Sequence, residues 1–203
     1  MKKQDSLKKI LKIVIALFGL GLTIMHVLYP AAWPKLLSYL ATIILPFLPE
    51  ILGFFGIKAS TRLQIAYLLF LGLAMVMGID FDLYKNWYIL GNPCFDKIVH
   101  TISGVFAAFV AKETLDSNYD GKNVKTTGSG AVVKHYNSGF AWLFIVSFVA
   151  LSAAGWECFE FLYDQIAGGN MQELISSGLD DTMWDILSAL TTGIITALFL
   201  KRK

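Results

Sequence analysis

Residues 140–163 read FAWLFIVSFVALSAAGWECFEFLY, and no charged side chain interrupts this run before Glu157. A helix of about 20 apolar residues crosses the hydrocarbon core of a bilayer, so the run predicts a transmembrane helix. Its last turns also carry Glu157 and Glu160, which are costly to expose to lipid. The run therefore predicts both the class of fold and a polar site within it.

Comparable apolar runs recur along the whole chain. The 203 residues are 56% hydrophobic and only 16% charged, which excludes an ordinary soluble domain. We predict an all-α fold, a polytopic transmembrane bundle of about six helices, with residues 1–203 forming one integral membrane domain. The helices are expected near residues 10–29, 36–55, 63–79, 97–112, 140–164 and 183–200, and a cytoplasmic polar loop over residues 113–138.

The distribution of charge predicts the orientation of this bundle. Lys and Arg near membrane segments are retained in the cytoplasm. With both termini cytoplasmic, only Lys35, Lys85 and Lys97 of the 17 basic residues fall on the outer side, so the basic residues follow the topology and form no nucleic-acid patch. The outer half is acidic and should attract cations; it contains Asp80, Asp82, Asp96, Glu157, Glu160, Asp164, Glu173, Asp180, Asp181 and Asp185.

Several of these acids share helical faces. Residues three or four apart lie on one face of a helix, and three such sets occur: Asp96 with His100, Glu157 with Glu160 and Asp164, and Asp181 with Asp185. Carboxylates packed together cannot all stay ionised without compensation. They are expected to share protons, to bind a cation or to pair with Lys97.

Metal-assisted catalysis is the first chemistry that this pattern allows. A divalent ion such as Mg, Mn or Zn, bound by His100, Glu157, Glu160 and Asp185, would act as a Lewis acid or activate a water. His26, near the outer end of the first helix, is a candidate second imidazole. Helix-borne acids and histidines form metal sites of this kind inside helical bundles.

Acid–base catalysis without a metal is the second chemistry that this pattern allows. His100, Asp96 and Glu157 are then the candidate catalytic residues, with a carboxylate orienting the imidazole. In either case Asp164 and Asp181 would set the electric field at the entrance. The same groups would also serve a proton- or cation-coupled transporter, or a purely structural polar network between helices; no internal repeat supports a transporter with inverted repeats.

Prolines and glycines predict local geometry. Pro46 and Pro49 should kink or end the second helix. Gly104, Gly155 and Gly193 are expected where helices approach each other closely.

The segment before the fourth helix carries Tyr84, Trp87 and Tyr88, which predict either an aromatic belt at the lipid head groups or a lid over the site. Cys94 and Cys158 both fall near the outer boundary. An oxidising compartment there would permit a disulfide, and the sequence leaves their pairing open.

Three motifs carry a family resemblance: Phe95-Asp96-Lys97-x-x-His100-x-x-Ser103-Gly104, Gly155-Trp156-Glu157-x-x-Glu160, and Asp181-Thr182-x-Trp184-Asp185 with Gly193 following. Through them the chain resembles the YjdF group of bacterial inner-membrane proteins and, more distantly, VanZ-like proteins, which share an Asp-Lys-x-x-His segment. The resemblance implies a multi-pass protein of the bacterial inner membrane connected with the cell envelope. Membrane lipids and a lipid-linked substrate are the expected partners, and no reaction follows from the resemblance.

Overall fold

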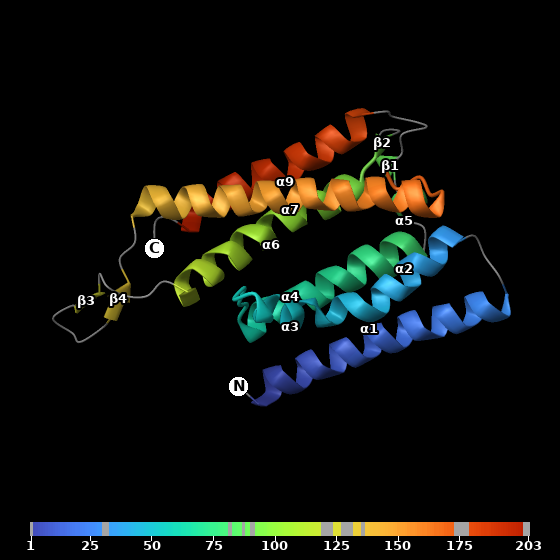
Figure 1. The fold of residues 1–203 in the computed structure, drawn as a ribbon, viewed down its shortest axis with the longest axis horizontal. Coiled ribbons are helices and arrows are strands. Elements are labelled where there is room, and N and C mark those ends of the chain that lie inside the picture. Colours follow the sequence, from blue (N-terminus) through green and yellow to red (C-terminus); the bar gives the residue numbers. More distant parts are fainter. Residues whose placement is uncertain are drawn as a thin grey trace.

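The computed structural model describes residues 2–29, 33–80, 83–86, 88–89, 92–118, 124–126, 132–134, 137–172 and 179–200. Within these ranges, six helices are long and apolar enough to cross a membrane: Lys2–Leu28, Lys35–Phe54, Thr61–Gly78, Phe95–Asn118, Ser138–Ala167 and Leu179–Leu200. They run side by side along the long axis of the molecule (Figure 1). The prediction of a transmembrane helical bundle is confirmed.

The first three crossings contain irregular helix. They comprise α1 (Lys2–Leu28), α2 (Trp33–Ile44), the 3-10 helix η1 (Leu45–Phe47), α3 (Leu48–Phe54), α4 (Thr61–Leu71) and the π-helical segment η2 (Gly72–Asp80). Pro46 lies in η1 and Pro49 in the first turn of α3. Because proline cannot donate a backbone hydrogen bond, the second crossing changes from α to 3-10 geometry there, as the sequence predicts.

The second half of the chain supplies the other three crossings. A short helix α5 (Leu83–Asn86) and the antiparallel strands β1 (Tyr88–Ile89) and β2 (Asn92–Pro93) precede α6 (Phe95–Asn118). Strands β3 (Val124–Thr126) and β4 (Val132–Lys134) pair antiparallel between α6 and α7 (Ser138–Ala167), and α9 (Leu179–Leu200) follows. In both pairs the register joins the outermost residues, Tyr88 with Pro93 and Val124 with Lys134.

The predicted loop over residues 113–138 begins too early, whereas its end agrees with the start of α7 to within one residue. Helix α6 continues to Asn118 and α7 already begins at Ser138, with β3 and β4 between them; residues 119–123, 127–131 and 135–136 lie outside the described residues. The longer α6 is stabilised by Lys112, which donates to Asp116 at 2.5 Å one turn further on. Asn118 then donates to the carbonyl of Gly56 at 2.6 Å.

The first helix is also longer than expected. It begins at Lys2 rather than near residue 10, because Lys, Gln and Leu are good helix formers although they are not all apolar.

Helices α6, α7 and α9 pack on one another and form the half of the bundle that contains the predicted motifs (Figure 1). The crossing of α6 and α9 is close: a Cβ on Gly104 would clash with the carbonyl oxygen of Ala189, and the hydroxyl of Thr192 donates to the carbonyl of Thr101 at 2.7 Å. Gly193 similarly meets Val149 of α7. Small residues at these two positions therefore let the helix axes approach.

Gly155 does not share this role. Apart from the backbone of α7 itself, no atom of the described residues lies within 4 Å of the position that a Cβ would take there, so the prediction of a close contact at Gly155 is wrong.

This difference gives a matched pair of variants. Gly104→Ala should lower the free energy of unfolding by about 1–3 kcal/mol, because the added methyl group must push backbone apart. Gly155→Ala should change it by less than about 0.5 kcal/mol. Thermal unfolding in detergent measures both, and equal melting temperatures for the two variants would contradict the close crossing of α6 and α9.

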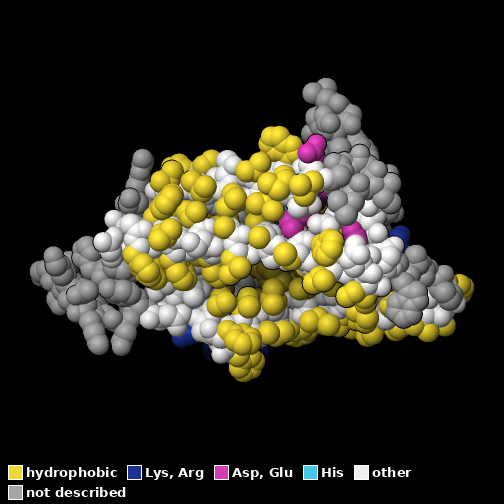
Figure 2. Space-filling view, turned by 45° about the horizontal axis from the view of Figure 1, so that its top comes forward, with side chains coloured by type: hydrophobic (Ala, Val, Ile, Leu, Met, Phe, Trp, Pro, Cys, Tyr) yellow, Lys and Arg dark blue, Asp and Glu magenta, His cyan; other side chains and the backbone are white. Residues whose placement is uncertain are grey.

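The two ends of the bundle differ in character. The described ends of the chain lie at one end of the bundle, and α5, β1, β2 and the first turn of α6 lie at the other (Figure 1). Much of the surface between them is hydrophobic, and the acidic side chains visible in this view gather toward one end (Figure 2). Leu151 is 73% exposed and Phe199 is 65% exposed on such faces, as expected of residues that contact lipid.

Candidate functional site

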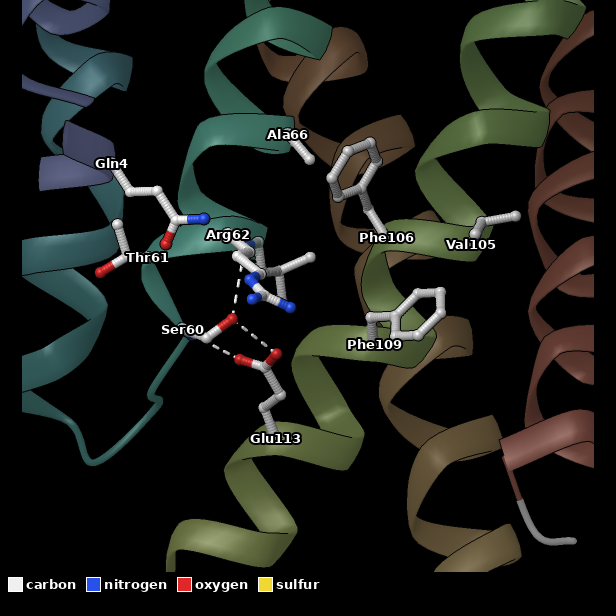
Figure 3. Close-up of a pocket in the computed structure, with 10 residues that line it drawn as sticks. Gln4, Ser60, Thr61, Arg62, Ala66, Val105, Phe106, Phe109 and Glu113 are labelled. Carbon is white, nitrogen blue, oxygen red and sulfur yellow. Dashed lines mark hydrogen bonds between the residues drawn. The ribbon is translucent and has the colours of Figure 1, made fainter. Parts of the chain in front are cut away.

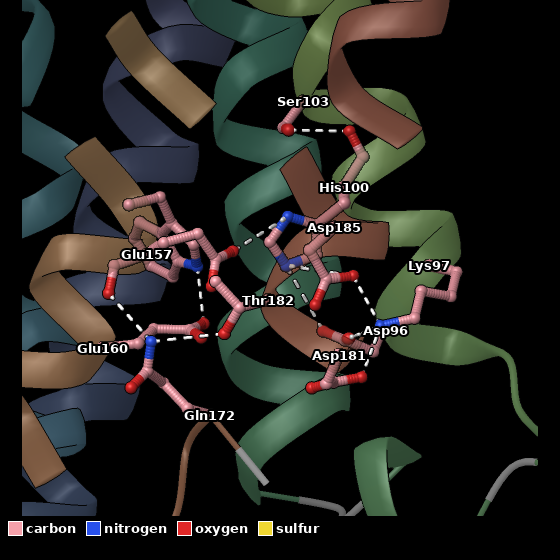
Figure 4. Close-up of polar contacts among 11 residues, drawn as sticks. Asp96, Lys97, His100, Ser103, Glu157, Glu160, Gln172, Asp181, Thr182 and Asp185 are labelled. Atoms are coloured by element: carbon pink, nitrogen blue, oxygen red, sulfur yellow. Dashed lines mark hydrogen bonds and ion pairs between the residues drawn. The ribbon is translucent and has the colours of Figure 1, made fainter. Parts of the chain in front are cut away.

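One buried imidazole lies at the centre of the predicted cluster (Figure 4). The Nε2 atom of His100 is 3.4 Å from Asp96 Oδ1 and 3.9 Å from Asp185 Oδ1, whereas Nδ1 is 3.8 Å from Glu157 Oε1. These carboxylates come from α6, α9 and α7, respectively. His100 is only 4% exposed, so three helices meet around a single histidine in the interior.

Local helix geometry explains this convergence. Asp96 lies in the first turn of α6 and Asp181 in the first turn of α9, where the partial positive charge of a helix N-terminus stabilises a carboxylate. His100 and Asp185 follow one turn deeper, on the same faces. Helix α6 therefore directs Asp96 and His100 toward α9, and α9 directs Asp181 and Asp185 toward α6.

Lys97 provides the positive charge at this end of the site. Its ammonium donates to Asp181 Oδ1 at 2.5 Å, to Asp185 Oδ1 at 2.7 Å and to Asp96 Oδ2 at 3.1 Å. Of the three compensations that the sequence left open, pairing with Lys97 is thus present. The carboxyl groups around His100 and Lys97 still outnumber the cationic groups, so part of the negative charge has no counter-ion among the described residues.

Glu157 is the carboxylate that most clearly lacks a hydrogen bond to offset its burial. Its side chain is 5% exposed, and neither Oε1 nor Oε2 has a hydrogen-bond partner in the described part of the chain. Burial of an ionised carboxylate without a partner is very unfavourable. The position therefore calls for a proton or a bound cation next to His100.

A candidate metal centre follows from the same geometry. Asp96, His100 and Asp185 each offer a ligand atom, and these atoms lie within 4.8 Å of one another. Carboxylate oxygens with one imidazole nitrogen suit Mg, Mn or Zn. The residues present therefore fit a divalent ion, and Glu157 lies on the other side of the imidazole.

Two other predicted site residues bond elsewhere. Glu160 is buried but accepts a hydrogen bond from Trp156 Nε1 at 2.6 Å. Asp164 accepts from the backbone N–H groups of Met171 at 2.7 Å and Gln172 at 3.0 Å, so its carboxylate holds the turn that ends α7. The structure brings neither of them into the group formed by Asp96, His100 and Asp185.

Other sequence predictions can be placed as well. His26 lies against Tyr39, with 6.2 Å between ring centroids, and is absent from the metal-ligand group found among the described residues. The hydroxyl of Ser103 donates to the carbonyl of His100 at 2.7 Å. Cys94 is half-buried and Cys158 is exposed, and they form no disulfide with each other.

Sequence reasoning missed Gln172, which is 6% exposed. Its side-chain amide donates to the carbonyl of Glu157 and to Thr182 Oγ1, both at 3.3 Å. Gln172 thereby fastens the chain after α7 to both α7 and α9. No motif in the sequence signals this role, because the contact depends on how the turn folds back.

Tyr84 of α5 packs against the first residue of α6. Its ring meets that of Phe95 edge to face, with 5.0 Å between centroids. Burial raises the pKa of the Tyr84 phenol, and the nearby carboxylates of Asp96, Glu160 and Asp185 raise it further. Of the other aromatic residues predicted to form a belt or a lid, Trp87 lies outside the described residues, as does the side chain of Tyr88.

Comparison with known proteins identifies the family. Residues 7–203 match the family described as "Predicted membrane protein (DUF2238)". No curated protein and no solved structure matches the chain. The match covers nearly the whole sequence and agrees with a multi-pass membrane protein, so the chain belongs to the DUF2238 family of predicted membrane proteins.

Proposed function

We propose that the protein is a bacterial inner-membrane enzyme that acts, with a bound divalent cation, on the polar part of a lipid or lipid-linked cell-envelope molecule. One observation carries the proposal: the buried, unpartnered carboxylate of Glu157 faces an imidazole whose other nitrogen faces Asp96 and Asp185. An acidic cluster alone is common in proteins. An uncompensated carboxylate at 5% exposure is costly, and a cation bound on the other side of His100 would offset part of that cost.

Asp96, His100 and Asp185 would hold the cation, which would supply a Lewis acid for the polar group of the substrate. Nε2 of His100 is the nitrogen on that side, and Nδ1 faces Glu157 Oε1 at 3.8 Å. A carboxylate behind a metal-binding histidine fixes the orientation of its ring and raises its basicity. Glu157 would thus act through His100, by positioning its ring on the side away from the cation.

The bilayer favours a lipid-linked substrate. The site lies at the end of α6, α7 and α9 where Tyr84 of α5 packs on Phe95, and the outer surfaces of these helices are apolar. A molecule anchored in the membrane reaches such a site by lateral diffusion, with its polar part near the head-group level. The resemblance to the YjdF group and to VanZ-like proteins, which implies a connection with the cell envelope, also supports an envelope substrate.

The orientation of the bundle is part of this proposal. Both termini should be cytoplasmic and the His100 site should open outward, because basic residues are retained inside. Green fluorescent protein fused after Lys203 should fluoresce, and alkaline phosphatase at the same position should be inactive. Alkaline phosphatase inserted between Asp80 and Leu83 should be active, and the reverse pattern would overturn the orientation.

Lipid turnover tests the function directly. Purified protein is incubated with a total lipid extract of a bacterial envelope and Mg, Mn or Zn, and products are identified by mass spectrometry. Glu157→Gln should lower the rate of product formation by about 10–100-fold, as loss of the carboxylate behind a metal-binding histidine does. Glu160→Gln is the matched control on the same helix, because its amide oxygen can still accept from Trp156.

The outcomes separate the hypotheses. A lower rate in Glu157→Gln but not in Glu160→Gln supports the positioning role assigned to Glu157. If wild type and Glu157→Gln form product equally fast, or if no lipid is altered under any metal condition, the proposed enzyme activity is wrong.

A structural role is the second candidate function. The ion pairs of Lys97 favour this role for the aspartates of α9. Lys97 of α6 joins Asp181 and Asp185 of α9, which pins these helices together. In that case amide replacements at the acids would lower the melting temperature and leave every lipid unaltered.

A further inference from the structure

A cavity lies at the opposite end of the bundle from His100. It has a volume of about 800 Å³ and lies between α4 and α6, next to the start of α1 (Figure 3). Volumes of this size accommodate organic ligands. Its walls come from both halves of the bundle and are polar at one end and apolar at the other.

Arg62 and Glu113 bring opposite charges to the polar end (Figure 3). Glu113 accepts hydrogen bonds from the backbone N–H of Ser60 and, at 2.8 Å, from its hydroxyl, so its carboxylate is fixed in the wall. The guanidinium of Arg62 has neither a hydrogen bond nor an ion pair among the described residues. One fixed anion and one unpaired cation thus share the same opening.

Val105, Phe106 and Phe109 line the apolar end, together with Ala66 of α4. Val105 and Glu113 are two turns apart, which corresponds to about 12 Å along α6. The cavity therefore changes from charged to apolar along the direction in which the helices cross the membrane. A phospholipid has the same change of polarity over its head group and upper acyl chain.

We propose that this cavity binds one zwitterionic aminophospholipid of the inner leaflet, with its phosphate on Arg62 and its ammonium on Glu113. Charge complementarity selects this occupant. Arginine binds phosphate through paired N–H donors, and the oxygens of Glu113 retain lone pairs for an ammonium group. A purely anionic head group would meet the carboxylate of Glu113 without compensation.

The acyl chain of this lipid lies along Phe106 and Phe109. The lipid therefore fills the space between α4 and α6 and joins the two halves of the bundle. This site is separate from the His100 cluster, and its occupancy does not depend on the proposed reaction.

Lipid titration of the full-length protein tests the proposal. The protein in mild detergent is titrated with phosphatidylethanolamine or phosphatidylglycerol, and adducts are counted by native mass spectrometry. Arg62→Gln should weaken binding of phosphatidylethanolamine about tenfold, because one charge-assisted contact is lost. Lys58→Gln is the matched control: Lys58 is an exposed cation just before α4 that does not line the cavity.

Two further variants address charge and shape separately. Glu113→Gln should shift the preference from phosphatidylethanolamine toward phosphatidylglycerol, and Ala66→Phe should reduce binding of both lipids by filling the cavity. If Arg62→Gln binds phosphatidylethanolamine as tightly as Lys58→Gln does, the site is not a head-group site. If wild type prefers phosphatidylglycerol, the assignment of a zwitterionic lipid is overturned.

Discussion

Asp185→Ala is expected to lower the melting temperature of the protein by roughly 10 °C. The Asp185 side chain is 2% exposed and lies between the ammonium of Lys97 at 2.7 Å and Nε2 of His100 at 3.9 Å. Removal of one partner from a buried ion pair costs about 3–5 kcal/mol, and each kcal/mol shifts the melting temperature of a chain of this size by about 2–4 °C. Thermal unfolding in detergent measures the change.

Asp116→Ala is the control for this prediction. Asp116 pairs with Lys112 at 2.5 Å on α6, but its side chain is 44% exposed, and exposed pairs contribute at most about 1 kcal/mol. A shift of Asp185→Ala as small as that of Asp116→Ala would show that the observed contacts of Asp185 do not hold α6 to α9. Asp185→Asn, which retains an acceptor of the same shape, should unfold at a temperature between those of wild type and Asp185→Ala.

Lys97→Met is expected to increase the affinity of the site for a divalent cation at least tenfold. Lys97 Nζ donates to Asp185 Oδ1, and Asp185 is one of the three residues whose ligand atoms could hold the ion. Two unit charges about 4 Å apart repel by several kcal/mol at the effective dielectric of a protein, so the ammonium opposes a bound cation. Isothermal titration with Mn or Zn measures the affinity.

The same substitution should make stability depend on metal. Without Lys97, the aspartates around it have no ammonium partner, so the metal-free variant should unfold at a lower temperature than wild type. Added metal should then stabilise the variant more than wild type, because a ligand that binds only the folded state raises its stability.

Lys112→Met removes a cation from the far end of α6 and should change neither the affinity nor this response. If Lys97→Met binds metal no more tightly than Lys112→Met does, Lys97 and the cation do not compete for Asp185.

The general architecture was accessible from the sequence because one physical requirement dominates it. Apolar runs must cross the bilayer as helices, so the number of crossings and the change to 3-10 geometry at Pro46 follow from the residues. The helix ends do not, since polar residues can extend a helix beyond the hydrocarbon. Lys2 and Asn118 show this: both belong to helices although the residues around them are polar.

The membership of the site could be predicted only in part. Helical spacing placed Asp96, His100, Glu157 and Asp185 on inward faces, and the structure brings all four together. The same spacing also selected Glu160, whose carboxylate bonds to Trp156 on its own helix instead. Spacing gives the face of a helix but not the rotation of each side chain.

Neighbour relations between helices were the harder part of the prediction. Helices α6 and α9 are far apart in sequence, and their close crossing depends on Gly104 meeting Ala189. The partners of Lys97 on α9 follow from that crossing, not from any local pattern. Pairing with Lys97 was therefore one of three open alternatives until the arrangement of the helices was known.

The metal content of the purified protein tests the central claim most directly. Wild type, Glu160→Gln and the double variant His100→Ala, Glu157→Gln are purified without chelator in mild detergent, and their metal is measured by elemental analysis. We predict about one divalent ion per folded chain in wild type and in Glu160→Gln, and none in the double variant, with all three still folded. Metal-free wild type that also fails to take up Mg, Mn or Zn on dialysis would contradict the account.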